Sequence, residues 1–163
     1  MMMAGLTLKL VSYNSTGLGG AKMEFISDML QEENVDILLL QETWLLSSNI
    51  TKLAEINDKF SFVGTSGMDE SQLLQGRPYG GLAIMWNKKL SCQIRPVDTG
   101  STRRICAVEL NCGAEKFLII NGYICLWIIR VNRLYMRIFF RCVIWWKFWL
   151  ISIYHTGLYL VVI

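Results

Sequence analysis

Asp36-Ile-Leu-Leu-Leu-Gln41 is an unbroken apolar run of strand length that ends in polar residues, and it decides the fold. Such a run is typical of a strand covered on both faces, as in the interior of an α/β layer. Residues 6–13 alternate apolar and polar at their start, which predicts a strand with one buried face. Residues 21–33, between the two, carry apolar side chains at helical spacing, and Asn34 follows as a left-handed terminator. Strand, helix and strand over about 35 residues predict a βαβ unit and an α/β fold.

The chain after residue 41 predicts a second helix followed by strands and turns. In order these are a helix at 47–58, a strand at 60–64, a polar surface loop at 65–79, a hairpin of 81–86 with 91–97, and a hairpin of 103–110 with 116–123. The pattern is an α/β layer whose strands end in polar loops.

Length and composition describe one ordinary domain with a core. The chain has 163 residues, a formal net charge of +3, 53% apolar residues and two prolines, which excludes disorder and most two-domain arrangements. Its five cysteines form no C-x-x-C pair and His155 is its single histidine, which argues against a zinc module and a disulfide scaffold. No secretory signal is visible at the N-terminus, so we expect reduced thiols and an intracellular protein, nuclear or cytoplasmic.

The charge pattern breaks sharply near residue 123. Residues 1–123 hold eleven Lys and Arg against all thirteen acidic residues, a net charge of −2. Residues 124–163 hold five basic residues and no acid, a net charge of +5, in a largely apolar stretch. We therefore divide the chain into a domain at 1–123 and an apolar, basic tail at 124–163.

Polar residues stand where two predicted strands end. The first strand ends at Asn14, and the apolar strand ends at Gln41 and Glu42. A carboxylate directly after buried aliphatic residues, with an amide beside it, suits Mg²⁺, which takes one or two carboxylates and keeps waters or phosphate oxygens. The alternative is that Glu42 only ends a strand at the surface and Asn14 only occupies a turn.

Five ordered blocks of the chain resemble the motifs of one superfamily. They are Ser12-Tyr-Asn-Ser-Thr-Gly-Leu18, Leu38-Leu-Leu-Gln-Glu-Thr-Trp-Leu45, Tyr79-Gly-Gly-Leu-Ala-Ile-Met85, Arg104-Ile-Cys-Ala-Val-Glu-Leu110 and Ile119-Ile-Asn-Gly-Tyr123. Together they are similar to the endonuclease/exonuclease/phosphatase superfamily, with the deoxyribonuclease-I-like fold. The stretch from Gly76 to Trp86 is similar to the endonuclease domains of LINE-type, non-LTR retrotransposons. The resemblance covers about residues 6–123.

The resemblance implies the N-terminal half of a four-layer α/β sandwich that hydrolyses phosphodiester bonds with Mg²⁺ or Mn²⁺. It implies that Glu42 binds the metal, that Asn14 helps place the phosphate and the metal-bound waters, and that Tyr123 hydrogen-bonds the phosphate. Gln41 is expected to orient Glu42 as a neighbour of the metal ligand. The alternative for Tyr123 is an aromatic residue packed in the sheet. DNA is the implied partner, while lipid, inositol phosphate or poly(A) substrates of the same fold stay open.

Two later blocks of the family have no counterpart in this sequence. No aspartate follows Asp98, and His155 stands in Ile-Tyr-His-Thr-Gly rather than in a Ser-Asp-His block. The group that would activate the attacking water is therefore missing, and we predict a truncated domain whose catalysis is lost. Half a sandwich is also expected to leave one sheet face wet.

The tail has two interpretations. Arg130, Arg133, Arg137 and Arg141 would share one face of a helix, which suits an interfacial, membrane-associated helix and a non-catalytic membrane protein. Alternatively, residues from about 125 onward come from a frameshift or read-through into non-coding sequence, which would explain the abrupt loss of acids and motifs.

Overall fold

The computed structural model describes residues 8–71, 76–123, 125–132, 135–142, 149–151 and 158–162. The first part of the chain contains β1 (Leu8–Asn14), α1 (Gly20–Glu32), β2 (Ile37–Gln41), the 3-10 helix η1 (Ser47–Glu55), β3 (Phe60–Thr65) and β4 (Leu82–Asn87). The second part contains β5 (Gln93–Val97), β6 (Ile105–Cys112), β7 (Glu115–Gly122), β8 (Cys125–Asn132), β9 (Tyr135–Cys142), β10 (Trp149–Ile151) and β11 (Leu158–Val162).

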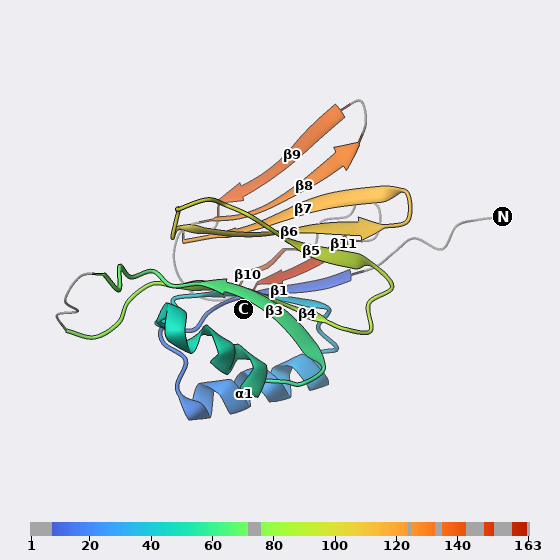
Figure 1. Ribbon diagram of the computed structural model, residues 1–163. Helices are drawn as coiled ribbons and strands as arrows, with labels where there is room; N and C mark the ends of the chain where they lie inside the picture. The colour runs from blue at the N-terminus through green and yellow to red at the C-terminus, as the bar shows by residue number, and fades with distance from the viewer. Residues whose placement is uncertain are drawn as a thin grey trace.

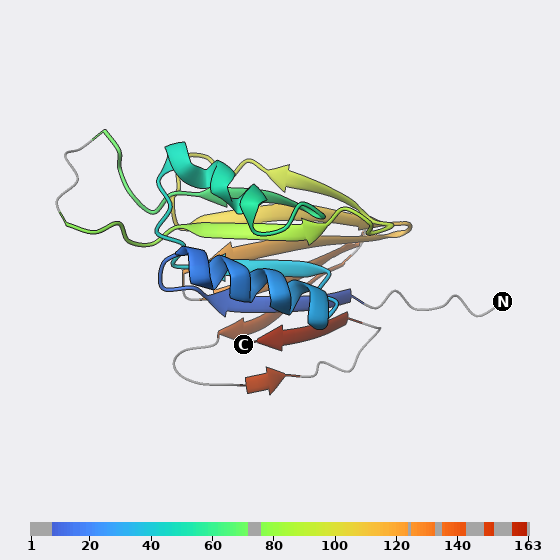
Figure 2. The same ribbon diagram turned by 90° about the horizontal axis from the view of Figure 1, so that it is seen from below.

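The strands form two sheets. The first sheet is mixed and has the order β10-β11-β1-β2-β4-β3, with β1 parallel to both β2 and β11. The second sheet is antiparallel and has the order β5-β6-β7-β8-β9. Figure 1 shows the first sheet between the helices and the second sheet, and Figure 2 shows α1 and η1 lying on its outer face. The fold is thus α/β, as the βαβ pattern predicted.

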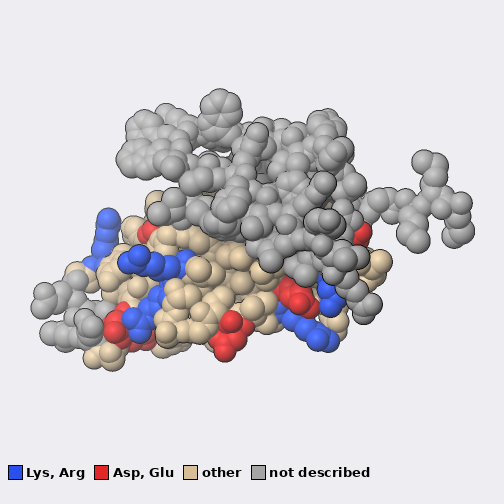
Figure 3. Space-filling view, turned by 90° about the horizontal axis from the view of Figure 1, so that it is seen from above, with Lys and Arg blue, Asp and Glu red and all other residues tan. Residues whose placement is uncertain are grey.

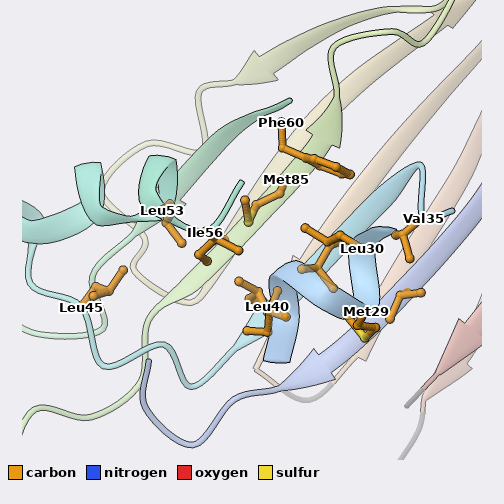
Figure 4. Close-up of a cluster of buried hydrophobic side chains, with 13 residues drawn as sticks. Met29, Leu30, Val35, Leu40, Leu45, Leu53, Ile56, Phe60 and Met85 are labelled. Carbon is orange, nitrogen blue, oxygen red and sulfur yellow. The ribbon is translucent and has the colours of Figure 1, made fainter. Parts of the chain in front are cut away.

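The apolar run in β2 is buried on both faces, as the sequence predicted. Its four aliphatic residues, from Ile37 to Leu40, have no exposed surface. Leu38 and Leu40 pack in the core under the helices, with Ile26, Leu30 and Met85 (Figure 4). On the opposite face, aliphatic residues of the first sheet pack against those of the second, namely Leu8, Leu10, Ile37, Leu39, Leu82 and Ile84 against Val108, Leu110 and Ile119.

The helix α1 ends where the sequence predicted. Asn34 lies just beyond its last turn with a φ of 49°, in the left-handed region. In that conformation the Val35 amide donates back to the Leu30 carbonyl at 3.2 Å, and the chain turns directly into β2. An exposed Asn suits this position because its short polar side chain tolerates a positive φ better than most residues do.

The hairpin predicted for residues 81–97 is wrong. β4 pairs with β2 and β3 in the first sheet, whereas β5 pairs with β6 in the second. The reason is burial: Leu82 to Met85 are all buried, so β4 needs cover on both faces, while β5 is mostly exposed and forms a sheet edge. The other hairpin, β6 with β7, is confirmed, and it turns at Gly113.

The expectation of a wet sheet face is also wrong for the first sheet. The second sheet covers the face opposite the helices, and strands from residues 124–163 contribute to both layers. β8 and β9 extend the second sheet from β7, and β11 lies beside β1. The stretch interpreted as a membrane-associated helix forms β8 and β9 instead. The division of the chain at residue 123 stays a prediction.

Two further observations bear on the sequence expectations. Cys92 and Cys112 are joined by a disulfide of 2.12 Å, so reduced thiols were the wrong expectation for this pair. Gln93 lies opposite Asn111 at the end of the β5–β6 pairing, and the two cysteines are the next residues beyond this pair. The Cα atoms of Cys92 and Cys112 are therefore 4.5 Å apart. Among the described residues, neither helix has the length and apolar character needed to span a bilayer.

Candidate functional site

The predicted site residues lie where several strands end at one edge of the sandwich. Because β1 and β2 are parallel, their carboxyl ends meet, and Asn14 lies directly opposite Gln41. Figure 1 shows the start of β4 and the end of β7 at this same edge, beside the loop that joins β3 to β4. The topology thus brings Asn14, Glu42, Gly81 and Tyr123 to one end of the molecule.

Glu42 occupies a tight turn directly after β2. Its φ of 53° lies in the left-handed region, as does the φ of 56° at Trp44. The carboxylate oxygen Oε2 accepts hydrogen bonds from Trp44 Nε1 at 3.0 Å and from the Gly80 amide at 3.1 Å. In the described part of the chain, no hydrogen bond reaches the other oxygen, Oε1. The half-buried carboxylate is therefore held in place through one oxygen while the other is available to a ligand.

Gly80 and Gly81 lock this turn against the start of β4. The amides of Thr43 and Trp44 donate to the carbonyls of Gly81 and Gly80, at 3.2 and 2.7 Å. Both glycines have a positive φ, and a Cβ on Gly80 would lie 1.7 Å from Tyr123 Oη. Only glycine allows so close an approach.

Tyr123 follows β7 and reaches across to this turn. Its Oη accepts a hydrogen bond from the Gly81 amide at 2.7 Å, which leaves the hydroxyl hydrogen free to donate to a further acceptor. Burial raises the pKa of Tyr123, and the nearby Glu42 charge raises it further. The hydroxyl therefore keeps its proton at neutral pH. Tyr123 also packs on the core between the sheets, as its alternative interpretation expected, and its hydrogen bond to a phosphate stays a prediction.

Asn14 is exposed at the end of β1. Its Oδ1 accepts a hydrogen bond from the Thr16 amide at 3.1 Å, which closes a local turn. The loop then runs beside the Glu42 turn, with the amides of Gly17 and Leu18 donating to the carbonyls of Glu42 and Thr43 at 2.6 and 3.0 Å. No hydrogen bond joins Asn14 to Glu42 among the described residues, so their convergence on one metal ion stays a prediction.

Gln41 makes its contacts toward the space between the sheets. Its Nε2 donates to Ser12 Oγ at 3.1 Å and to Asn121 Oδ1 at 2.7 Å. Asn121 is fully buried and received no role from the sequence. The available signal was its position: a polar amide on the inward-facing side of β7, two residues after the buried Ile119 and two residues before Tyr123.

Sequence reasoning also missed Arg77 and Gly67. The Arg77 guanidinium lies 4.7 Å from the Trp44 ring centroid, a cation–π contact beside the Glu42 turn. A Cβ on Gly67 would lie 2.2 Å from Tyr123 Oη, so this glycine, like Gly80, makes room for the hydroxyl. Arg77 lies in the stretch from Gly76 to Trp86 that carries the retrotransposon resemblance, but that stretch does not predict its contact with Trp44. No hydrophobic period or charge cluster marks Gly67.

Basic and acidic side chains are mixed on the described surface, and two arginines lie near the site. Arg77 lies beside Trp44, and Arg104 is close enough to Tyr123 for its charge to act on the hydroxyl. Figure 3 shows Lys and Arg interspersed with Asp and Glu among the residues that it colours. Arg103 pairs with Asp69 at 3.2 Å, and Lys88 Nζ donates to the Asp58 carbonyl at 2.7 Å. Surface contacts of this kind contribute little to stability.

The residues present fit a magnesium-type ion. No cluster of three or more His, Cys, Asp or Glu side chains, as in a cage of protein ligands, occurs among the described residues. Mg²⁺ needs no such cage, because one or two carboxylates suffice when water and phosphate oxygens complete its shell. Glu42 supplies such a carboxylate, because no residue in the described ranges forms a hydrogen bond to its Oε1.

The chain is similar to known proteins in sequence family and in fold. The model of the Endonuclease/Exonuclease/phosphatase family matches residues 11–156. No curated protein matches the sequence. One similar solved structure is the AP endonuclease LMAP from Leishmania major, with a TM-score of 0.50 and 19% identity over 71% of this chain and 40% of that chain.

A second similar structure is the endonuclease domain of TRAS1, a telomere-specific non-LTR retrotransposon. Its TM-score is 0.48, with 15% identity over 69% of this chain and 44% of that chain. The chain thus spans less than half the length of both neighbours. At such identities the AP endonuclease likeness shows a shared fold and nothing finer.

Proposed function

Since the chain belongs to the endonuclease/exonuclease/phosphatase family, we propose that it carries the metal- and phosphate-binding part of a nuclease site. The observation that supports this most is the Glu42 carboxylate, which Trp44 and Gly80 fix through Oε2, while no described residue forms a hydrogen bond to Oε1. The Tyr123 hydroxyl is anchored on the adjacent Gly81 amide. A carboxylate for a cation and a hydroxyl donor for an anion stand side by side, which suits a phosphate bound together with a divalent ion.

Each residue has a defined task in this proposal. Glu42 holds Mg²⁺ or Mn²⁺ through Oε1, and the bound ion supplies positive charge against the phosphoryl oxygens. Tyr123 donates its hydroxyl hydrogen to a phosphate oxygen, since Gly81 already occupies one lone pair of Oη. Asn14 offers its amide nitrogen, because its Oδ1 is used by Thr16. Gln41 supports the Glu42 turn from inside the sandwich.

DNA is the proposed substrate class. The stretch from Gly76 to Trp86 resembles retrotransposon endonucleases, and the solved structure with a TM-score of 0.50 is described as an endonuclease. The exposed Tyr79 and the Arg77–Trp44 pair add an aromatic and cationic surface beside Glu42. Such surfaces bind nucleic acids through stacking and cation–π contacts.

We further propose that the chain by itself binds without hydrolysing at family rates. This sequence has no aspartate after Asp98, so residues 99–163 offer no aspartate carboxylate to activate the attacking water. General-base catalysis contributes about 10²–10⁴-fold, and the loss of several members of one catalytic unit is more severe.

The test is Mn²⁺ binding in the presence of a short DNA duplex, measured by water-proton relaxation. We expect binding by the unmodified chain and a loss of at least about tenfold in Glu42→Gln, which keeps the shape and removes the charge. Glu24→Gln, an exposed site on α1, is the matched control and should bind as the unmodified chain does. Equal binding by the Glu42 and Glu24 variants would remove Glu42 as the ligand.

Plasmid nicking with Mg²⁺ tests the second part of the proposal. We expect the unmodified chain and Glu42→Ala to nick at the same background rate. Turnover by the unmodified chain that disappears in Glu42→Ala would show that catalysis is retained.

A further inference from the structure

We propose that Asn121 is a positioning residue that holds Glu42 and Tyr123 in register across the two sheets. This inference rests on the proposed function of those two residues. Asn121 lies on β7 and is fully buried between the sheets. Its side chain makes three hydrogen bonds with the described residues, and all three go to the first sheet.

The contacts of Asn121 use the whole capacity of its amide for donation. Nδ2 donates to the Leu40 carbonyl and to the Ala83 carbonyl, both at 2.9 Å. Oδ1 accepts from Gln41 Nε2 at 2.7 Å. Leu40 and Ala83 lie opposite each other in the pairing of β2 with β4, so one side chain ties these two strands to β7.

Each of the three tied segments leads directly to a site residue. Leu40 and Gln41 end β2, and Glu42 follows them. Ala83 lies near the start of β4, two residues after Gly81, whose amide anchors the Tyr123 hydroxyl. Asn121 is itself two residues before Tyr123 on β7. Asn121 therefore joins the three parts of the chain that carry the Glu42 carboxylate, the Gly81 amide and the Tyr123 hydroxyl.

Chemistry explains why an amide stands at this position. Two donors and one acceptor are needed at once, and an Asn side chain provides them in one rigid plane. A leucine of similar size would remove the donor to both carbonyls and one of the two acceptors of Gln41 Nε2, and an aspartate would place negative charge against two carbonyl oxygens. A buried position that only filled space would favour an apolar side chain, since unsatisfied polar groups are costly there.

The first measurement is amide hydrogen exchange at Gly80 and Gly81, which requires no metal ion. These amides are held by Glu42 Oε2 and Tyr123 Oη. In Asn121→Leu we expect their protection to fall by about tenfold or more relative to the amides of α1. The control is Leu110→Ala, which weakens the same core between the sheets from another strand. In this variant, the protection of the two glycine amides relative to the α1 amides should stay as it is in the unmodified chain.

The second measurement is Mn²⁺ binding with the DNA duplex. We expect Asn121→Leu to weaken it by about 10–100-fold, the range found for residues that orient metal ligands, while Leu110→Ala keeps it. Asn121→Ser is the second variant, because a small hydroxyl leaves room for a bridging water if the leucine variant does not fold. It should show an intermediate loss in both measurements.

The outcomes separate this inference from the proposed function. Unchanged glycine protection in both Asn121 variants, or an equal loss in Leu110→Ala, overturns the positioning role. A loss of glycine-amide protection with unchanged Mn²⁺ binding overturns it as well, because metal binding would then not depend on how the two sheets are aligned at Asn121. Absent Mn²⁺ binding by the unmodified chain contradicts the proposed function alone, and the exchange result still decides whether Asn121 holds the two segments.

Discussion

The Tyr123 hydroxyl and the Gly81 amide are joined by a hydrogen bond of 2.7 Å that spans the two sheets of the sandwich. Tyr123 follows a strand of the second sheet, and Gly81 precedes a strand of the first. On its far side, the Gly80–Gly81 pair holds the turn that carries Glu42. The candidate site is thus formed by a contact between the two sheets rather than within one loop. Substitutions in it should therefore change both the stability of the protein and the binding of ligands.

Gly80→Ala should destabilise the protein more than Gly76→Ala. Both glycines have a positive φ, 66° and 86°, so both variants incur a backbone cost of about 1 kcal/mol. A Cβ on Gly80 would also lie 1.7 Å from Tyr123 Oη, whereas one on Gly76 meets nothing within 4 Å. We expect overpacking to add about 1–3 kcal/mol for Gly80→Ala alone, measured by urea unfolding. Equal losses in the two variants would mean that the Tyr123 side chain moves aside freely.

Stability should fall above about pH 10 in a way that depends on Tyr123. Burial first, and then the Glu42 charge, raises the pKa of Tyr123 above its ordinary value of 10.0. The unfolded chain therefore loses this proton at a lower pH than the folded one. The contribution is fully present below pH 10 and is lost as the pH rises through the folded-state pKa.

The measurement is the free energy of unfolding at a series of alkaline pH values, compared between the unmodified chain and Tyr123→Phe. Burial also raises the pKa of Cys106, to about 12, so both proteins share that thiol's contribution and their difference isolates Tyr123. Parallel pH profiles for the two proteins would contradict the raised pKa of Tyr123.

Asn34→Ala should cost about 1 kcal/mol of unfolding free energy, because alanine tolerates the left-handed conformation at φ 49° poorly. Asn34→Gly should be neutral or stabilising at the same position, since glycine adopts a positive φ without a Cβ clash. Thermal or urea unfolding distinguishes the two variants. A greater loss for the glycine variant would show that the Asn side chain, rather than its backbone, stabilises the end of α1.

Reduction of the disulfide between Cys92 and Cys112 should lower the unfolding free energy by about 3 kcal/mol. The two cysteines are 20 residues apart. Opening a loop of that length increases the conformational entropy of the unfolded chain, which favours unfolding by about this much. Urea unfolding with and without a phosphine reductant measures the effect. Peptide mapping under non-reducing conditions is the control, and the absence of a linked peptide containing both cysteines would support the reduced state expected from the sequence.

Local pattern was a good guide wherever the fold depends on neighbours in the chain. The apolar run in β2, the helical spacing in α1 and the asparagine that ends α1 each predicted the observed element. The polar residues at the ends of β1 and β2 predicted that Asn14 and Glu42 lie at one sheet edge, because parallel strands bring their carboxyl ends together. The same reasoning failed for β4 and β5, which are neighbours in sequence but lie in different sheets.

The amino-acid sequence by itself therefore determined the βαβ unit, the family and the edge at which the carboxylate lies, because periodicity and ordered motifs are properties of nearby residues. Only the tertiary structure decided which groups hold that carboxylate and the tyrosine. Gln41 and Asn121 are separated by 80 positions along the chain and meet only because one sheet packs on the other. Contacts of that kind depend on the register between layers, and no local pattern of side chains encodes that register.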